Sequence, residues 1–200
     1  IGAHRDEFIP GLEELAQIIR DNGAKSAVQL NHAGRYNSSF FLNGRQAVAP
    51  SAKPSKLTQE TPRALEKEEI LQIIESFSQA ALRVQKAGFD AVEILCGTGY
   101  LISEFLSPLT NLRTDEYGGS QENRMRFALQ VLHSIRSKTG GNFPIIVRMN
   151  GNDLMQDGLG RLDLQECARR LASVVDALCI NVGWHEAGVP QITSSVPRGA

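Results

Sequence analysis

The stretch Phe89–Gly119, FDAVEILCGTGYLISEFLSPLTNLRTDEYGG, decides how the rest of the chain is interpreted. It opens with a short β run, Ala91 to Leu95, and then breaks into Gly97-Thr98-Gly99, followed at once by Tyr100. Glycines allow the backbone to turn sharply and to approach another molecule closely. Because α/β folds build their active sites at the carboxyl ends of strands, a polar side chain presented by such a turn is a candidate functional group.

Composition limits the class of protein that this chain can be. A chain of 200 residues with 42% hydrophobic content can form one domain with a sizeable core. The formal net charge of -1 gives no electrostatic footprint for nucleic acid or an anionic membrane, and no apolar run approaches the roughly 20 residues of a membrane helix. The 3 cysteines are few and far apart, which favours a reducing, cytoplasmic setting and argues against disulfides or a metal site.

Apolar periodicity predicts alternating strands and helices. The predicted strands are 24–30, 91–95, 144–149 and 177–182, and the predicted helices are 12–19, 70–87, 123–138 and 163 to about 174. Asp163 is expected to cap the last helix, with Glu166 completing a capping box. Residues 36–60 show no period and are predicted to form a long loop.

This βαβ repetition predicts an α/β fold with a parallel sheet. The strands are continuously apolar, as expected when both faces are covered, and a barrel segment and an open doubly wound sheet both fit. A different polar group follows each strand, which favours the barrel: His32 and Arg35, then Thr98 and Tyr100, then Arg148 and Asn150, then Trp184 and His185. A full barrel needs roughly 250 residues, so we expect a partial TIM (β/α)8 barrel.

Several motifs resemble those of the old yellow enzyme family of FMN-dependent (β/α)8-barrel oxidoreductases. They are Gln29 through Arg35 (QLNHAGR), Gly99-Tyr100-Leu101 with Phe105 through Pro108, and Asn111 through Gly119 with Glu122-Asn123-Arg124. The segments Gly183 through Ala187 and Val196 through Ala200 look most like the 2,4-dienoyl-CoA reductase branch. The resemblance implies that residues 1–200 are an incomplete FMN-binding barrel domain of a longer protein, from helix 2 to just after strand 6.

The resemblance also implies a chemistry. NADPH or NADH reduces FMN, a hydride passes to an activated C=C bond, and Tyr100 supplies the proton with His185 orienting its phenol. A neighbouring imidazole would help the phenol to transfer its proton near neutral pH, since the ordinary pKa of a phenol is ~10. Gln29 and Arg148 would bind the flavin, where an arginine stabilises negative charge.

The predicted partner is a small-molecule enoyl or dienoyl thioester, with His32, Arg35 and Thr98 as substrate-binding residues. His32 could equally hold the following loop through backbone bonds. Many old yellow enzymes carry a His-x-x-His or His-x-x-Asn pair where this chain has Leu95 and Thr98, which favours the dienoyl branch. A 4Fe-4S cluster and FAD are expected only in C-terminal regions beyond this chain.

Other interpretations stay open at this point. A flavin barrel could act on another enoate, an enone or an amine, because loops decide the substrate in this fold. The chain could also be a non-catalytic barrel fragment, in which Tyr100 is a half-buried residue at a strand end. Arg113, Asp115 and Arg124 are expected to form a structural ion-pair cluster, and His4 and His133 to lie at the surface.

Overall fold

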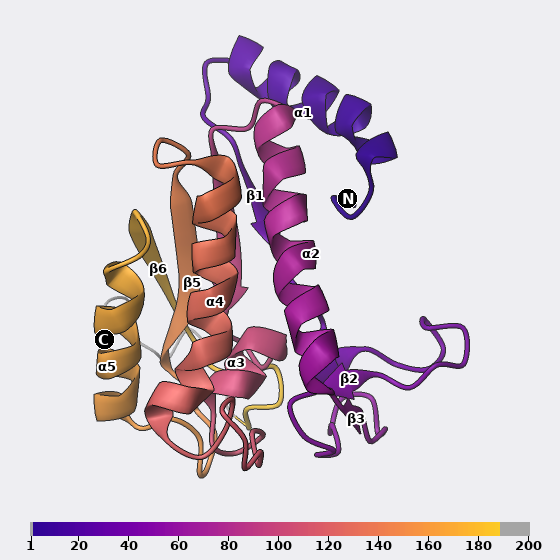
Figure 1. Cartoon of the computed structure of the whole chain (residues 1–200), viewed down its shortest axis with the longest axis vertical. Coiled ribbons are helices and arrows are strands. Elements are labelled where there is room, and N and C mark those ends of the chain that lie inside the picture. Colours follow the sequence, from indigo (N-terminus) through magenta and orange to yellow (C-terminus); the bar gives the residue numbers. More distant parts are fainter. Residues whose placement is uncertain (1, 189–200) are drawn as a thin grey trace.

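The computed structural model describes residues 2–188 and is built around one parallel sheet (Figure 1). Its strands are β1 (Ala27–Leu30), β4 (Ala91–Cys96), β5 (Ile145–Asn152) and β6 (Ala177–Val182), in the order β1-β4-β5-β6. The helices are α1 (Ile9–Asp21), α2 (Lys67–Lys86), α3 (Leu101–Leu106), α4 (Gln121–Thr139) and α5 (Arg161–Ala172), with short 3-10 turns η1 (Asp6–Phe8) and η2 (Gly34–Tyr36). All three strand pairs are parallel.

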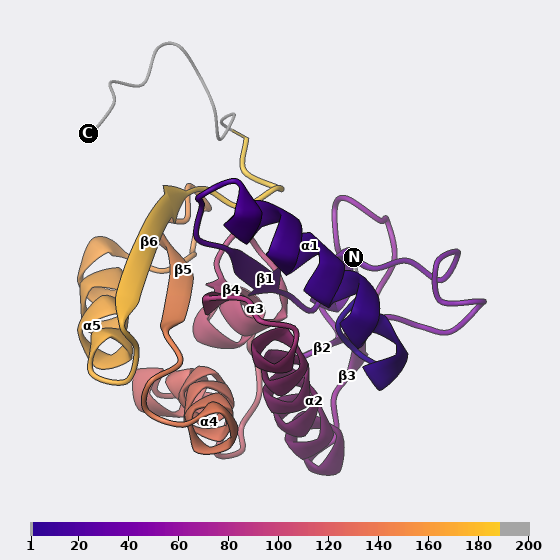
Figure 2. The ribbon, with the colours of Figure 1, turned by 90° about the horizontal axis from the view of Figure 1, so that it is seen from above.

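The strand order distinguishes the two architectures that the sequence left open. Strands follow one another across the sheet in chain order, so the described part has no switch point of the kind that defines a doubly wound sheet. The helices α2, α4 and α5 form one layer on the same side of the sheet (Figures 1 and 2). Sequential parallel strands with their helices on one side are the repeating unit of a (β/α) barrel.

The core lies between this helical layer and the sheet. Val92 and Ile94 of β4 and Val147 of β5 point into it and are fully buried. Phe77 of α2 and Leu132 of α4 pack against them from the other side. The long helices form because apolar residues recur at helical spacing, and Ser120 caps α4 by accepting a hydrogen bond from the Asn123 backbone N–H (3.2 Å).

Two expectations about the strands and helices are wrong. The prediction that both faces of every strand are covered holds at the central strands, but β6 is largely exposed, with Ile180 at 56%. An edge strand lacks a neighbour, so its burial depends on what packs beyond it. Helix α5 begins at Arg161 with Gly160 as its N-cap, and the carboxylate of Asp163 instead accepts from the Gly160 N–H (3.2 Å).

The long loop at 36–60 is confirmed in the main, but it contains one strand of a small parallel ladder, whose other strand lies just after the loop. The two strands of this ladder are β2 (Val48–Ala49) and β3 (Arg63–Ala64). Strands of this length carry no detectable alternation, and distant chain segments must meet before they form.

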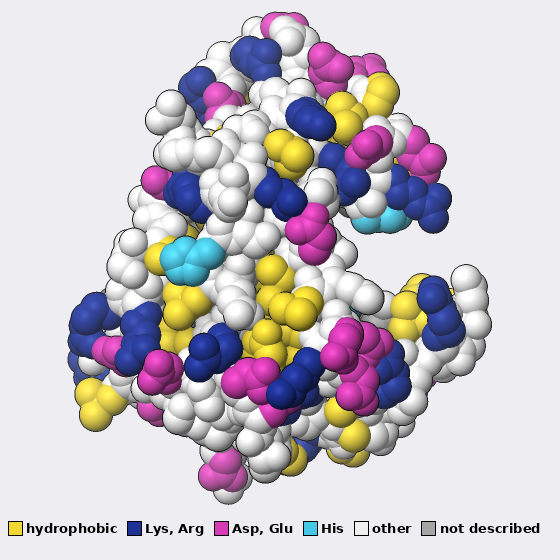
Figure 3. All heavy atoms as spheres, in the orientation of Figure 1, with side chains coloured by type: hydrophobic (Ala, Val, Ile, Leu, Met, Phe, Trp, Pro, Cys, Tyr) yellow, Lys and Arg dark blue, Asp and Glu magenta, His cyan; other side chains and the backbone are white. Residues whose placement is uncertain are grey.

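Side chains that the sequence placed at the surface or in a structural cluster are partly confirmed. His4 and His133 are exposed, and Arg113 pairs with Asp115 (2.6 Å). Arg124 does not join that pair, because its guanidinium donates to the carbonyls of Leu106 and Gly119. Acidic and basic groups alternate over the helical face (Figure 3). No helix in residues 2–188 is long and apolar enough to cross a membrane.

Candidate active site at the carboxyl ends of the strands

The turn after β4 carries Tyr100 and is under conformational constraint. Thr98 and Gly99 both have positive φ (60° and 92°), a region that a β-branched residue rarely adopts. The Thr98 N–H donates to Asn150 Oδ1 (3.2 Å) on β5, and the Thr98 side chain is buried. The surrounding structure therefore holds the turn in a conformation that the local sequence alone would not favour.

Helix α3 fixes where this turn points. Tyr100 is its N-cap residue, and all residues of α3 are buried. The Ser103 hydroxyl accepts a hydrogen bond from the Gly99 N–H (3.0 Å) and lies 3.0 Å from the Gly97 carbonyl. Apolar periodicity does not predict this helix, because all six residues are buried and no face of the segment is exposed to solvent.

The turn after β6 brings His185 to Tyr100. The His185 N–H donates to the carbonyl of Thr98 (3.2 Å), so the loops of β4 and β6 meet across the end of β5. The rings of Tyr100 and His185 are 5.2 Å apart at their centroids and nearly perpendicular. Tyr100 is half-buried and His185 is exposed, so both can be reached by a ligand.

A buried ion pair clamps the His185 turn in place. Arg35 donates through Nη2 to the carboxylate of Glu186 and through Nη1 to the Pro54 carbonyl (2.7 Å). Glu186 also accepts from the Ser55 hydroxyl (3.1 Å) and the Lys56 N–H (2.6 Å). The Arg35 and Glu186 side chains are only 3% and 2% exposed. The guanidinium of Arg35 is thus engaged within the protein, an arrangement that does not favour its expected contact with substrate.

Two titratable groups lie buried near this clamp. Burial raises the pKa of Glu104 well above its ordinary value, while the hydrogen bond from the Arg35 N–H (2.9 Å) opposes that shift. Burial lowers the pKa of the His32 imidazole. A neutral imidazole fits its geometry, since His32 Nδ1 accepts from the Gly34 N–H (3.1 Å) and holds the loop in the way the second interpretation of this residue predicted.

The predicted flavin-binding residues share one face of the sheet. Gln29 aligns with Glu93, and Leu95 aligns with Arg148, so alternation along β4 places all of them on the face away from the helices. Gln29 Nε2 donates to Glu93 Oε1 (2.5 Å). Arg148 is half-buried and has no hydrogen bond or ion pair within residues 2–188. A half-buried guanidinium without a protein partner suits an anionic or electron-rich ligand, and in this respect the residues present fit FMN.

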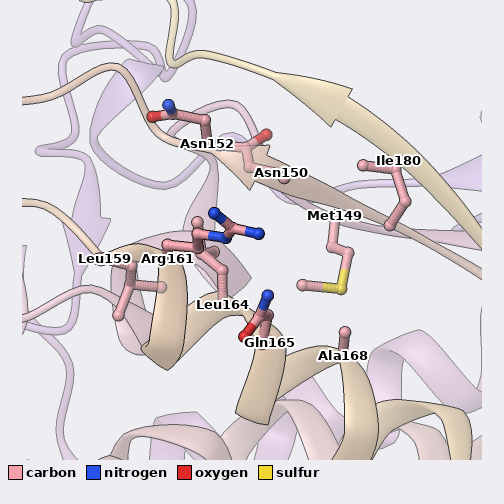
Figure 4. Close-up of a pocket in the computed structure, with 11 residues that line it drawn as sticks. Met149, Asn150, Asn152, Leu159, Arg161, Leu164, Gln165, Ala168 and Ile180 are labelled. Carbon is pink, nitrogen blue, oxygen red and sulfur yellow. The ribbon is translucent and has the colours of Figure 1, made fainter. Parts of the chain in front are cut away.

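Two cavities lie along the strands of the sheet. A cavity of about 490 Å³ borders β1 and includes both Gln29 and His32 in its lining. A second cavity of about 370 Å³ lies between β5, β6 and α5, and Arg161, Gln165 and Ile180 line it (Figure 4). Neither Tyr100 nor His185 borders this second cavity. Within residues 2–188, no group of His, Cys, Asp or Glu side chains is placed to hold a metal ion.

Of the predicted site residues, the structure brings together Tyr100, His185 and Thr98, and it assigns internal partners to His32 and Arg35. Sequence reasoning missed Tyr36, whose ring contacts both Tyr100 and His185. It also missed the buried partners Glu104 and Glu186. The one sequence feature that could have drawn attention to Tyr36 is its position directly after the motif Gln29–Arg35. A local pattern does not predict which distant ring a turn residue contacts. The segment Val196–Ala200 lies outside the described residues.

Comparisons with known proteins place this chain in a family. The chain is 52% identical over 196 residues to a metal reductase of Desulforamulus reducens, covering 98% of this chain and 29% of that protein. It is 40% identical over 184 residues to an NADPH dehydrogenase of a Geobacillus species, covering 92% of this chain and 52% of the relative. The solved structure of a 2-naphthoyl-CoA reductase complex superposes with a TM-score of 0.90 at 34% identity, covering 95% of this chain and 31% of that one.

The chain therefore spans between 29% and 52% of the length of these curated relatives. The match to (β/α)-barrel flavoenzymes confirms the partial barrel. Residues 1–200 all match the family described as NADH:flavin oxidoreductase / NADH oxidase. The chain belongs to this family, and the resemblance to the old yellow enzymes is confirmed.

Proposed function

We propose that the complete protein reduces an activated C=C bond of an enoyl or dienoyl thioester, with Tyr100 as the proton donor. The observation that carries this proposal is the contact between Tyr100 and His185, which come from different strand ends to one accessible position (centroids 5.2 Å apart). The similarity to a 2-naphthoyl-CoA reductase supports a thioester substrate.

Bound FMN would supply the redox chemistry, the transfer of two electrons from NADPH or NADH to an alkene carbon as a hydride. Gln29 and Arg148 would hold it on the open face of the sheet, and the Arg148 guanidinium would balance negative charge. Tyr100 gives its phenolic proton to the substrate carbon that the hydride leaves electron-rich, so that H⁻ and H⁺ together saturate the bond. His185 orients the phenol, Thr98 shapes the turn beneath it, and Arg35 acts by fixing the His185 turn.

The proposal is tested by Tyr100→Phe in the complete protein. Flavin reduction by NADPH should stay within about twofold of wild type, whereas reoxidation by a dienoyl-CoA should slow by roughly 10²–10⁴-fold, the usual contribution of a general acid. Stopped-flow absorbance separates the two half-reactions. Equal rates in both half-reactions would exclude Tyr100 as the acid.

A second candidate function is the reduction of a metal ion complex, which the 52% identity to a metal reductase favours. Electron transfer to a soluble ferric chelate does not need a carbon acid–base partner. The Tyr100→Phe variant should therefore keep its ferric citrate reductase activity while it loses thioester reduction. A wild-type protein that reduces ferric citrate but no enoyl or dienoyl thioester would replace the first proposal with the second.

A further inference from the structure

Tyr36 contacts both members of the proposed proton-donating pair. It is the last residue of η2, directly after the clamped Arg35. Its ring centroid lies 5.6 Å from that of Tyr100 and 5.8 Å from that of His185, in edge-to-face arrangements. Since Tyr100 and His185 also contact each other, the three rings form a closed triangle in which each ring restricts the other two.

The backbone holds Tyr36 firmly in this triangle. The Tyr36 N–H donates to the Ala33 carbonyl (3.1 Å), and the adjoining Arg35 side chain is buried in the ion pair with Glu186. The hydroxyl end of the ring lies directly over Gly99, because a Cβ at that position would fall 2.0 Å from the Tyr36 oxygen. Gly99 thus allows the ring to approach the turn that carries Tyr100.

The contacts of Tyr36 with Tyr100 and His185 are contacts between rings. The Tyr36 hydroxyl is buried and makes no hydrogen bond of good geometry in the described part of the chain. Burial raises the pKa of this phenol, and the neighbouring Arg35 guanidinium opposes that shift. A buried donor without a partner lowers stability by about 1–3 kcal/mol, so a phenylalanine could fill the same space without that penalty. This separation makes the role of the ring testable on its own.

We propose that Tyr36 is a positioning residue whose ring holds the Tyr100 phenol and the His185 imidazole in a fixed mutual orientation. The inference rests on the proposed function, because it assigns Tyr36 a part in proton delivery by Tyr100. A displacement of about 1 Å in a reacting group can lower a rate by about 10²-fold. Loss of the ring should therefore be costly to proton transfer even though Tyr36 itself transfers no proton.

The experiment compares Tyr36→Phe with Tyr36→Leu in the complete protein. Tyr36→Leu should slow reoxidation by a dienoyl-CoA by roughly 10–10²-fold and leave flavin reduction by NADPH within about twofold. Tyr36→Phe should restore reoxidation close to the wild-type rate. Tyr117→Leu is the matched control, since this buried tyrosine packs on Phe105 and touches neither ring of the pair; it should change thermal stability but not the reoxidation rate.

A spectroscopic readout tests the ring contact without turnover. In protein labelled with ¹³C-histidine, the signal lost on His185→Asn identifies His185. That signal should move in Tyr36→Leu, because the ring 5.8 Å away is gone, and stay in place in Tyr36→Phe. If Tyr36→Leu does not fold, Tyr36→Met replaces it as a flexible filler of the same space.

Two results would overturn the inference. If Tyr36→Leu is reoxidised at the wild-type rate and its His185 signal does not move, the Tyr36 ring does not position the pair. An equal loss in Tyr36→Phe and Tyr36→Leu would assign the effect to the hydroxyl. If the wild-type protein is not reoxidised by any thioester, the proposed function fails, and the His185 signal still decides whether Tyr36 positions the pair.

Discussion

The Arg35–Glu186 clamp gives a quantitative prediction. Both side chains are almost fully buried (3% and 2% exposed), and Glu186 accepts two further hydrogen bonds, from Ser55 and Lys56. The variant Arg35→Met keeps an apolar stem but leaves the Glu186 carboxylate buried without its cation. Removing one partner of a buried pair lowers stability by about 3–5 kcal/mol.

The corresponding change in melting temperature can be worked out. The melting temperature of a domain of this size falls by roughly 2–4 °C for each kcal/mol lost from the free energy of unfolding. Arg35→Met should therefore lower the Tm of the barrel domain by about 6–20 °C. Differential scanning calorimetry of the complete protein measures this change. Arg63→Met is the control, because Arg63 and Glu69 form a partly exposed pair (45% and 32%) that should contribute no more than about 1 kcal/mol.

The double variant Arg35→Met/Glu186→Gln tests the physical cause. Glutamine keeps an oxygen that can accept from Ser55 and Lys56 but carries no charge, so the double variant should regain roughly 1–3 kcal/mol over the single one. A double variant less stable than Arg35→Met would refute the reasoning that an uncompensated carboxylate causes the loss. A single variant within about 1 kcal/mol of wild type would show that the pair does not stabilise the turn.

The remaining predictions concern Glu104 and Arg148. Burial raises the pKa of Glu104. Above the ordinary carboxyl pKa of about 4.3, the unfolded chain therefore loses this proton while the folded chain keeps it. The free energy of unfolding consequently falls as the pH rises. Between about pH 5 and pH 8, the melting temperature of Glu104→Gln should therefore fall less than that of the wild-type protein. Melting temperatures that fall equally with pH in both proteins would contradict this prediction. Arg148→Met should weaken FMN binding by roughly 10–10²-fold, the value of a hydrogen bond to a charged group, as measured by fluorescence of released FMN. Arg169→Met, on an exposed side chain, should not change it, and equal affinities in both variants would remove Arg148 from the flavin site.

Much of the fold followed from the sequence because local and periodic signals dominate it. The strands at 91–95 and 177–182 and the helices at 70–87 and 123–138 were predicted to within a few residues of β4, β6, α2 and α4. Apolar spacing reports which side of an element is buried, and glycine ends helices such as α2, where Gly88 has a φ of 81°. The position of Tyr100 also followed, since it stands directly after a strand and a glycine turn, whereas its role as proton donor comes from the family resemblance and stays a proposal.

The tertiary structure decided which groups act on one another. Tyr36, Tyr100 and His185 are separated by long stretches of chain, and only the meeting of the β4 and β6 loops across β5 brings their rings into contact. The same holds for Arg35, which the sequence offered as a substrate contact and the fold pairs with Glu186, 151 positions away. The sequence determined the strands and the polar residues that follow each of them, while distances between strand ends depend on packing and register, which no local pattern encodes.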